Sequence, residues 1–333
     1  MKVLFNCHVP FSLAHGGAQI QIEQTRRALE LEGVVVEPLQ WWEDTQRGDV
    51  LQHFGRLPAH ILKLAQSKGM KVVVADLLTA MGSRPIWKIR LHRWMMLAVK
   101  KALPGQLISP LNWDTYPLAD ACTALTAWEA HLIRYLYDTP AGRVHVVPNG
   151  VEDVFFRAPA VQRGPWLICT ATVTPRKRVL ETARAAVAAR TPLWVLGRPY
   201  DERDAYGQEF EALAKAHPEL VRYQGPMSDR QQLAEAYRSA RGFVLLSTME
   251  SLSLSALEAA ACETPLLLGD LPWARSVFGA KACYCSISAG TDATATALRR
   301  FYDAAPTLPC PDRPMSWPEV ARAYIEVYRK ILR

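Results

Sequence analysis

The chain lacks several features that mark common protein classes. It contains no stretch of about 18 uncharged apolar residues, so no transmembrane helix is expected. Its seven cysteines are an odd number, and none has the spacing of a metal site, since Cys283 and Cys285 stand too close for a CxxC motif. They are expected to be reduced thiols in a cytoplasmic protein. No nucleic-acid-binding module is recognisable, so nucleic acid is not an expected partner.

A dinucleotide fingerprint of the form GxGxxG is also absent, as are internal repeats and low-complexity tracts. The sequence does offer 333 residues, half of them hydrophobic, with a formal net charge of +7. This length suits two domains of about 150 residues each. The positive charge favours acidic partners such as nucleotide phosphates or anionic lipid.

Strand-like apolar runs alternate with helical patterns along the chain, which predicts an α/β protein with parallel sheets. Strands are predicted at 3–7, 34–39, 49–54, 71–75, 122–126 and 144–147, and again at 166–172, 193–197, 221–225, 243–247 and 266–269. Helices are predicted at 18–32, with Ile20 and Ile22 inward, and at 58–67, 179–189, 206–217, 230–240, 254–262, 291–304 and 317–333. A boundary is predicted near 152–164, where residues 157–160 resemble a linker.

Glu250 and Glu258 bracket a serine-rich segment between a buried strand and an alanine-rich helix. Glu250 is expected in the strand-to-helix loop and Glu258 inside the helix, so that the helix-start N–H groups lie between two carboxylates. Such N–H groups bind phosphate, and carboxylates bind sugar hydroxyls. A nucleotide-sugar, with one diphosphate between two sugars, fits this arrangement. The plainer alternative is a pair of solvated glutamates, but the serines and the strand's carboxyl end favour a ligand site.

Two other segments suit phosphate. Arg176, Lys177 and Arg178 follow a strand and open a helix, where the helix dipole disfavours cations unless an anion binds there. Gly16 and Gly17 stand between the first strand and the first helix, where glycine permits close approach of a phosphate. A simple turn is the alternative for the glycine pair.

Residues 84–101 interleave basic residues with tryptophan and methionine. Two interpretations stay open. The segment lies on an anionic membrane surface, at the inner face, as a peripheral helix. Alternatively it is a core helix with a basic solvent face. The apolar stripe of Trp87, Leu91, Trp94, Ala98 and Ala102 suits either interpretation.

The order of these motifs resembles family 4 of the retaining glycosyltransferases, which have the GT-B fold. The resemblance rests on Gly16-Gly17-Ala18, the turn Val147-Pro148-Asn149-Gly150-Val151, Lys177, the strand-end glycines Gly197 and Gly225, and the E-x7-E element from Glu250 to Glu258. It implies two Rossmann-like domains facing a cleft. Residues 1–155 would form the acceptor side, 156–316 the nucleotide-sugar domain, and 317–333 a helix that crosses back to the first domain.

The resemblance further implies transfer of a hexose, with retained configuration, from a nucleotide-diphosphate sugar to a glycan or lipid-linked acceptor. Catalytic roles would fall to Glu250 and Lys177, with Asp76 contacting acceptor or sugar. The implied donor-binding residues are Gly16, Gly17, Arg176, Arg178, Gly197, Ser251, Leu252, Ser253, Leu254 and Glu258. No cofactor and no divalent metal is expected, since cations and helix ends neutralise the diphosphate.

Three positions depart from the family pattern. Thr172 replaces an arginine before the lysine, Glu263 replaces a glycine, and Ala75 replaces a histidine before Asp76. These departures keep a second hypothesis open, a catalytically weak GT-B binding or partner protein. A nucleotide-sugar epimerase of the same fold is a minor alternative, because no His/Asp catalytic cluster is apparent.

Overall fold

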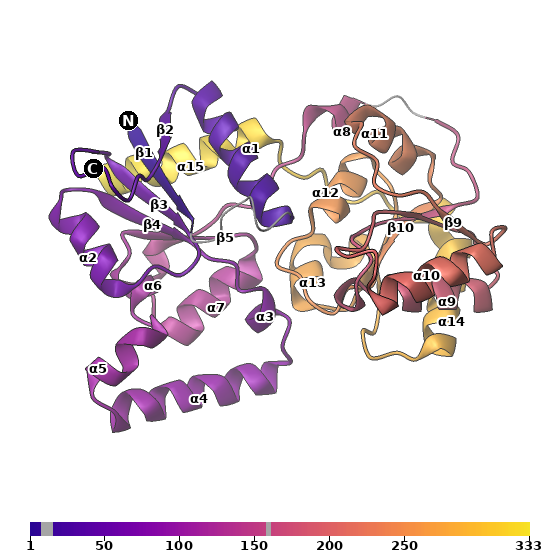
Figure 1. Ribbon diagram of the computed structural model, residues 1–333, viewed down its shortest axis with the longest axis horizontal. Helices are drawn as coiled ribbons and strands as arrows, with labels where there is room; N and C mark the ends of the chain where they lie inside the picture. The colour runs from indigo at the N-terminus through magenta and orange to yellow at the C-terminus, as the bar shows by residue number, and fades with distance from the viewer. Residues whose placement is uncertain (8–15, 158–160) are drawn as a thin grey trace. The chain divides into compact units, whose positions relative to one another are not determined.

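The computed structural model describes residues 1–7, 16–157 and 161–333, which form two compact units (Figure 1). The first unit comprises residues 1–150 and 315–333, and the second comprises 151–314. The sequence predicts the boundaries after 155 and 316. The first comes earlier because the short helix α8 (Asp153–Arg157) packs on helices α11 (Arg230–Ser239) and α12 (Leu254–Ala261) of the second unit. Most of the predicted linker, 158–160, lies outside the described residues.

The first unit is built on a sheet of six parallel strands. In spatial order they are β2 (Val35–Pro38), β1 (Lys2–Cys7), β3 (Val50–Phe54), β4 (Lys71–Ala75), β5 (Ala121–Ala124) and β6 (Val144–Val146). Its helices are α1 (Gly17–Leu31), α2 (Ala59–Ser67), α3 (Thr79–Gly82), α4 (Ile86–Ala102), α5 (Gly105–Ile108), α6 (Thr115–Leu118), α7 (Ala127–Tyr137) and α15 (Trp317–Leu332). The strand order 2-1-3-4-5-6 is that of a doubly wound sheet.

The second unit also has six parallel strands, in the order β12 (Cys283–Cys285), β11 (Leu266–Gly269), β10 (Gly242–Leu245), β7 (Leu167–Thr170), β8 (Leu193–Leu196) and β9 (Val221–Tyr223). Counted within the unit, this is the 3-2-1-4-5-6 order of nucleotide-binding sheets. The remaining helices are α9 (Val179–Ala188), α10 (Ala205–Ala216), α13 (Pro272–Phe278) and α14 (Thr291–Ala304).

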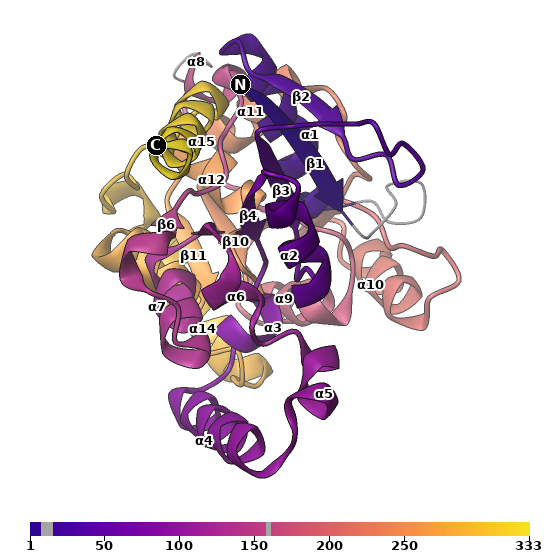
Figure 2. The ribbon, with the colours of Figure 1, turned by 90° about the vertical axis from the view of Figure 1, so that its left-hand side faces the viewer.

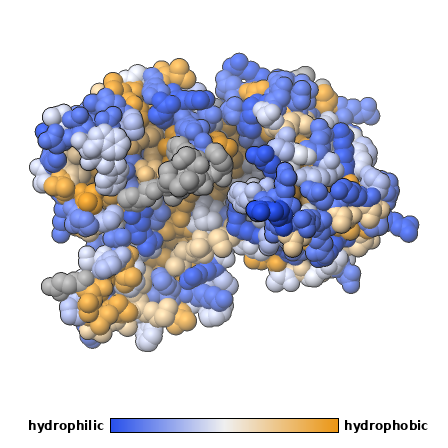
Figure 3. All heavy atoms as spheres, in the orientation of Figure 1, coloured by the Kyte–Doolittle hydropathy of each residue, from blue (hydrophilic) through white to orange (hydrophobic). Residues whose placement is uncertain are grey.

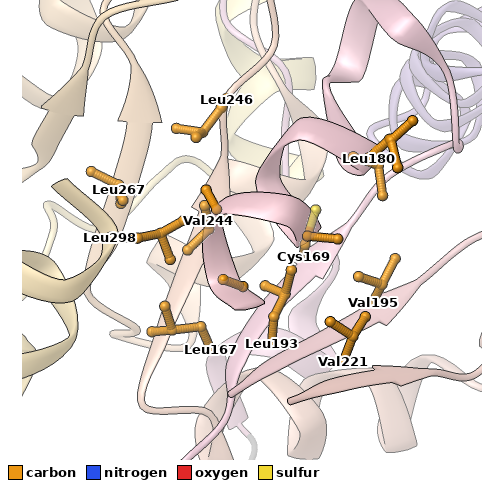
Figure 4. Close-up of a cluster of buried hydrophobic side chains, with 14 of the residues drawn as sticks. Leu167, Cys169, Leu180, Leu193, Val195, Val221, Val244, Leu246, Leu267 and Leu298 are labelled. Carbon is orange, nitrogen blue, oxygen red and sulfur yellow. The ribbon is translucent and has the colours of Figure 1, made fainter. Parts of the chain in front are cut away.

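Continuous apolar runs form the central strands because helices cover both faces of a parallel sheet. In the second unit, Leu167, Leu193 and Val244 come from three neighbouring strands, and Leu180 of α9 and Leu298 of α14 pack in the same cluster (Figure 4). The core therefore fixes the strands whose ends carry the candidate site.

The last helix, α15, belongs to the first unit and packs on α1. Figures 1 and 2 both show it beside the strands of that unit. It starts with a capping box between Ser316 and Glu319, and Tyr328 donates a hydrogen bond to the buried Gln52 of β3. Gly150 lies so close to this helix start that a Cβ there would be 2.8 Å from the Trp317 nitrogen. Close packing therefore explains the glycine of the Pro-Asn-Gly turn.

Several sequence predictions need correction. Ile20 is 41% exposed, because it lies two residues, or about 200° on a helix, from the buried Ile22. Of the two alternatives for residues 84–101, the core helix that buries this stripe is wrong, since α4 buries Ile89 and Met96 and leaves its tryptophans exposed. The short edge strand β12 was not predicted, and several strands end one or two residues early because the chain turns into loops at the carboxyl edge.

Candidate functional site

The second sheet has a topological switch point between β7 and β10. From β7 the chain builds outward through β8 and β9 on one side, and later through β10, β11 and β12 on the other. The loops that follow β7 and β10 therefore leave neighbouring strands at the same edge of the sheet. Open α/β sheets bind their ligands in the crevice at such a point.

These two loops are joined by an ion-pair cluster around Glu250. Lys177, from the loop after β7, forms a salt bridge with the Glu250 carboxylate. The Arg176 Nη1 lies 3.2 Å from the same carboxylate oxygen and donates a 2.8 Å hydrogen bond to the Met249 carbonyl. The side chains of Lys177 and Glu250 are largely buried, while Arg176 is 40% exposed. Two cations thus meet one carboxylate where a ligand is expected.

Helix α12 begins directly after this cluster, as the sequence predicts. Ser253 caps it and accepts a 3.4 Å hydrogen bond from the Ala256 N–H. Ser251, Leu252 and Ser253 are buried, and Leu254 and Ser255 are partly exposed in the first turn. The helix start therefore turns its N–H groups toward the edge of the sheet that carries Glu250.

Glu258 lies one turn further along α12 and is held by two side chains from α11. Arg230 forms a salt bridge with one carboxylate oxygen, and Tyr237 donates a 3.1 Å hydrogen bond to the other. Burial raises the pKa of Glu258 above its ordinary value, while Arg230 and Tyr237 oppose that shift. Arg230 also bonds Glu152 at 2.9 Å and stacks over the Phe155 ring. The carboxylate is consequently fixed in place.

Sequence reasoning missed Arg230 and Tyr237. A signal was present, since Arg230 opens α11 just after the cap residue Asp229, where the helix dipole disfavours a cation. The same criterion singled out Arg176 and Lys177.

Arg178 does not join the cluster that the sequence predicted for it. Its backbone is left-handed, with φ of 53°, and its guanidinium donates to the Ile287 and Ala289 carbonyls. The side chain is buried and ties the loop after β12 to the start of α9. This residue therefore orders the structure around the site.

Gly197 also has a positioning role. Its φ is +149°, and a Cβ there would lie 1.9 Å from the Ala171 carbonyl oxygen. Its N–H donates to the Gly225 carbonyl at 2.9 Å. Only glycine lets the loop after β8 pack this tightly on the loop after β7, which leads to Lys177.

The predicted sites in the first unit are more dispersed. Gly16 is the N-cap of α1 with extended backbone, and a Cβ there would meet no atom within 4 Å; Gly17 is the first residue of the helix. The loop before them, 8–15, lies outside the described residues. Asp76 follows β4 and accepts a hydrogen bond from Tyr116, while the Arg56 Nη2 lies 3.6 Å from it.

A cavity of about 440 Å³ lies at the carboxyl ends of the strands around β1. Phe5 and Phe54 form part of its wall with their rings edge to face, and Trp41, Arg26 and Asn6 also line it. Asn6 is 3% exposed, and its amide nitrogen has no hydrogen-bond partner in the part of the chain that the structure describes. A buried donor of this kind costs free energy unless a ligand or water satisfies it.

Two features are absent from the described residues. No group of three or more His, Cys, Asp or Glu side chains is placed to hold a metal ion. Within the same ranges, no helix combines the length and apolarity needed to cross a bilayer.

Comparison with known proteins agrees with this geometry. Residues 164–304 match the model of the family described as Glycosyl transferases group 1. Among curated proteins, the D-inositol 3-phosphate glycosyltransferases of Frankia alni and Jonesia denitrificans are 34% and 29% identical over 188 and 177 residues. These matches cover 49% and 45% of this chain. The chain spans less than half of the length of these relatives, 45% and 41%.

Solved structures match over almost the whole chain. Sucrose-phosphate synthase from Thermosynechococcus elongatus has a TM-score of 0.68 at 16% identity, covering 99% of both chains. Anabaena HepE in complex with UDP has a TM-score of 0.65 at 12% identity, covering 99% of this chain and 98% of its own. The chain therefore has the two-sheet GT-B fold, and the segment that matches the Glycosyl transferases group 1 model lies in its second unit.

Proposed function

We propose that the chain is a retaining glycosyltransferase that moves a hexose from a nucleotide-diphosphate sugar to an acceptor held by the first unit. The observation that carries the proposal is the convergence of Lys177 and Arg176 on Glu250 at the switch point of the second sheet. The family match of this unit and the glycosyltransferase names of the relatives support it. So do structural neighbours solved with UDP and with UDP-glucose.

Donor binding in this proposal is an exchange of ionic partners. Before the donor arrives, Glu250 neutralises Lys177 and Arg176. A diphosphate carries more negative charge than one carboxylate, so it takes over the two cations and the N–H groups at the start of α12. Glu250 then accepts hydrogen bonds from hydroxyls of the transferred sugar. Glu258, fixed by Arg230 and Tyr237, accepts those of the ribose.

The chemical step breaks the bond between the sugar C1 and the diphosphate oxygen, which keeps the electron pair. The acceptor oxygen bonds to C1 on the same face, and the acceptor proton passes to the departing phosphate oxygen. Negative charge grows on the diphosphate as the bond breaks, and Lys177 and Arg176 stabilise it electrostatically. Because these cations already supply the compensating charge, the proposal requires no divalent metal.

We place the acceptor in the cavity at the carboxyl ends of β1 and β3. These strands flank the switch point of the first sheet, so the position is equivalent to that of the donor site in the second. Apolar rings on the wall suit the body of an acceptor, and the buried Asn6 amide can donate to one of its oxygens. Asp76, supported by Tyr116 and Arg56, remains a candidate contact for an acceptor hydroxyl.

A thermal-shift panel of nucleoside diphosphates and nucleotide-sugars, in the presence of EDTA, tests the donor site. A ligand at 100 times its dissociation constant should stabilise the protein by about 2.7 kcal/mol. Glu258→Gln should abolish the shift, whereas the exposed Glu235→Gln on α11 should not. Absence of a shift with every nucleotide would refute the proposal. A shift without sugar transfer or donor hydrolysis would favour the catalytically weak partner protein.

Asn6→Leu tests the acceptor cavity separately. The isosteric change removes a buried donor that lacks a partner, so the unliganded protein should gain about 1 kcal/mol of stability. Acceptor affinity should fall while the nucleotide shift is unchanged. A variant that loses stability, or that keeps full acceptor affinity, would place the acceptor elsewhere.

A further inference from the structure

The surface formed by α4, α5 and the short turn Ser109–Leu111 exposes several large apolar side chains, and we refer to it as the α4–α5 surface. Trp87 and Trp94 are 62% and 67% exposed, and Leu91, Leu103, Leu107 and Leu111 are exposed as well. Figure 3 shows apolar atoms interleaved with hydrophilic ones over this part of the first unit. In Figures 1 and 2, α4 lies at the periphery of its unit. Exposed apolar side chains gathered on one surface in this way mark a candidate interaction site.

Helix α4 has one face that packs on the core of its unit, called the attached face here, and an opposite face that is exposed. At about 100° per residue, Ile89 and Met96 lie roughly opposite the stripe of Trp87, Leu91 and Trp94. The first two are buried against the core of the unit, and the stripe is exposed. The unit itself therefore cannot cover the stripe.

Cations flank this stripe on both sides. On the same wheel, Lys88 lies on one side, and Arg90 and Lys101 lie on the other. None of these three has a carboxylate partner in the described ranges, whereas Arg93 and Lys100 on the attached side pair with Asp138 and Asp114. An apolar stripe with cations along both sides is typical of a helix that lies in a membrane interface.

The positive charge of this segment favours an anionic partner. Residues 77–113 contain six arginines and lysines and no aspartate or glutamate. Tryptophan is the side chain enriched at the level of lipid headgroups, and anionic headgroups attract clustered cations. A protein partner or a second copy of the chain would have to present a surface that is both acidic and apolar. An anionic bilayer has both properties, because its headgroups are negatively charged and its interior is apolar.

We propose that the α4–α5 surface docks on an anionic lipid bilayer, with α4 parallel to the membrane plane. The stripe of Trp87, Leu91 and Trp94 enters the headgroup region, and Lys88, Arg90 and Lys101 contact lipid phosphates. This binding is independent of the donor and acceptor sites.

Co-sedimentation with vesicles tests the proposal, using phosphatidylcholine alone and phosphatidylcholine mixed with phosphatidylglycerol. The wild type should sediment with the anionic vesicles and release as salt approaches 1 M, where the screening length falls to about 3 Å. Trp87→Ser with Trp94→Ser should lower the vesicle partition coefficient by at least about tenfold. Lys88→Gln, Arg90→Gln and Lys101→Gln together should lower it by about 10²-fold, since each cation near the surface contributes about 1 kcal/mol, or roughly fivefold.

A matched control removes exposed apolar side chains elsewhere in the same unit. Trp42 and Leu31 are 87% and 86% exposed, so Trp42→Ser with Leu31→Ser should leave vesicle binding unchanged. Unchanged melting temperature and nucleotide shift in all variants would show that they are folded. Failure of the wild type to bind anionic vesicles would overturn the proposal. So would a dimer in solution that the double tryptophan variant converts to monomer, since a second copy would then cover the surface.

Discussion

The two sheets of this protein share a construction but carry different chemistry at their carboxyl edges. Each has six parallel strands, and in each the first strand lies at the switch point. In the second unit, charged side chains meet there in close ion pairs around Glu250 and Glu258. In the first, the corresponding edge bears a largely apolar cavity with one buried amide. In the proposed function, the fold therefore determines where ligands bind, and the local residues determine which ligands they are.

Removing Lys177 should have the largest effect on that contrast. In the proposed mechanism, Lys177→Ala deletes a cation at the growing diphosphate charge, so kcat for sugar transfer should fall by about 10² to 10³. Steady-state kinetics with the acceptor saturating would measure it. The exposed Lys215→Ala on α10 is the matched control. Unchanged turnover in Lys177→Ala would show that the charged edge is structural only.

Gly197→Ala should have the next largest effect, which is a loss of stability. The added Cβ would overlap the Ala171 carbonyl and would sit at a φ that only glycine adopts easily. Overpacking and backbone strain together should cost about 3 kcal/mol of unfolding free energy, measured by urea titration. Gly142→Ala, which faces open space in the first unit, should change it little. Equal effects of the two changes would contradict the packing argument.

Glu258→Gln should change how the stability of the protein depends on pH. A carboxyl whose folded pKa exceeds its unfolded pKa stabilises the fold fully below the unfolded value of about 4.5. That contribution is lost as pH rises through the raised folded pKa. The glutamine variant lacks this loss, so its stability relative to wild type should increase with pH above about 4.5. Urea unfolding from about pH 4 to pH 7 would measure the difference, and a flat difference would contradict the burial effect.

The smallest effect concerns Glu263, which has a φ of +58° just after α12. A side chain with a left-handed backbone is strained, and the glycosyltransferase family that the sequence resembles has glycine at this position. Glu263→Gly should therefore stabilise the second unit by about 0.5–1 kcal/mol, measured as a shift in the urea midpoint. A loss of stability would mean that the side chain compensates for its backbone.

The sequence was sufficient for most of the fold and for the centre of the candidate site. Alternating apolar runs predicted both sheets, and the short loops after β7 and β10 kept Lys177 and Glu250 close to their strand ends. Arg178 could not be placed in the same way, because its left-handed backbone turns the side chain away from its neighbours. The buried face of α4 could not be predicted either, since both sides of that helix carry apolar residues and only tertiary packing decides which side is buried.

The return of α15 has a consequence for how the chain is made. Residues 151–314 interrupt the first unit in sequence, so the ribosome completes the second unit before it synthesises α15. Until then the first sheet lacks the helix that buries Tyr324 and Tyr328 and bonds Gln52. The first unit therefore receives its last structural element only after the whole of the second unit has been synthesised.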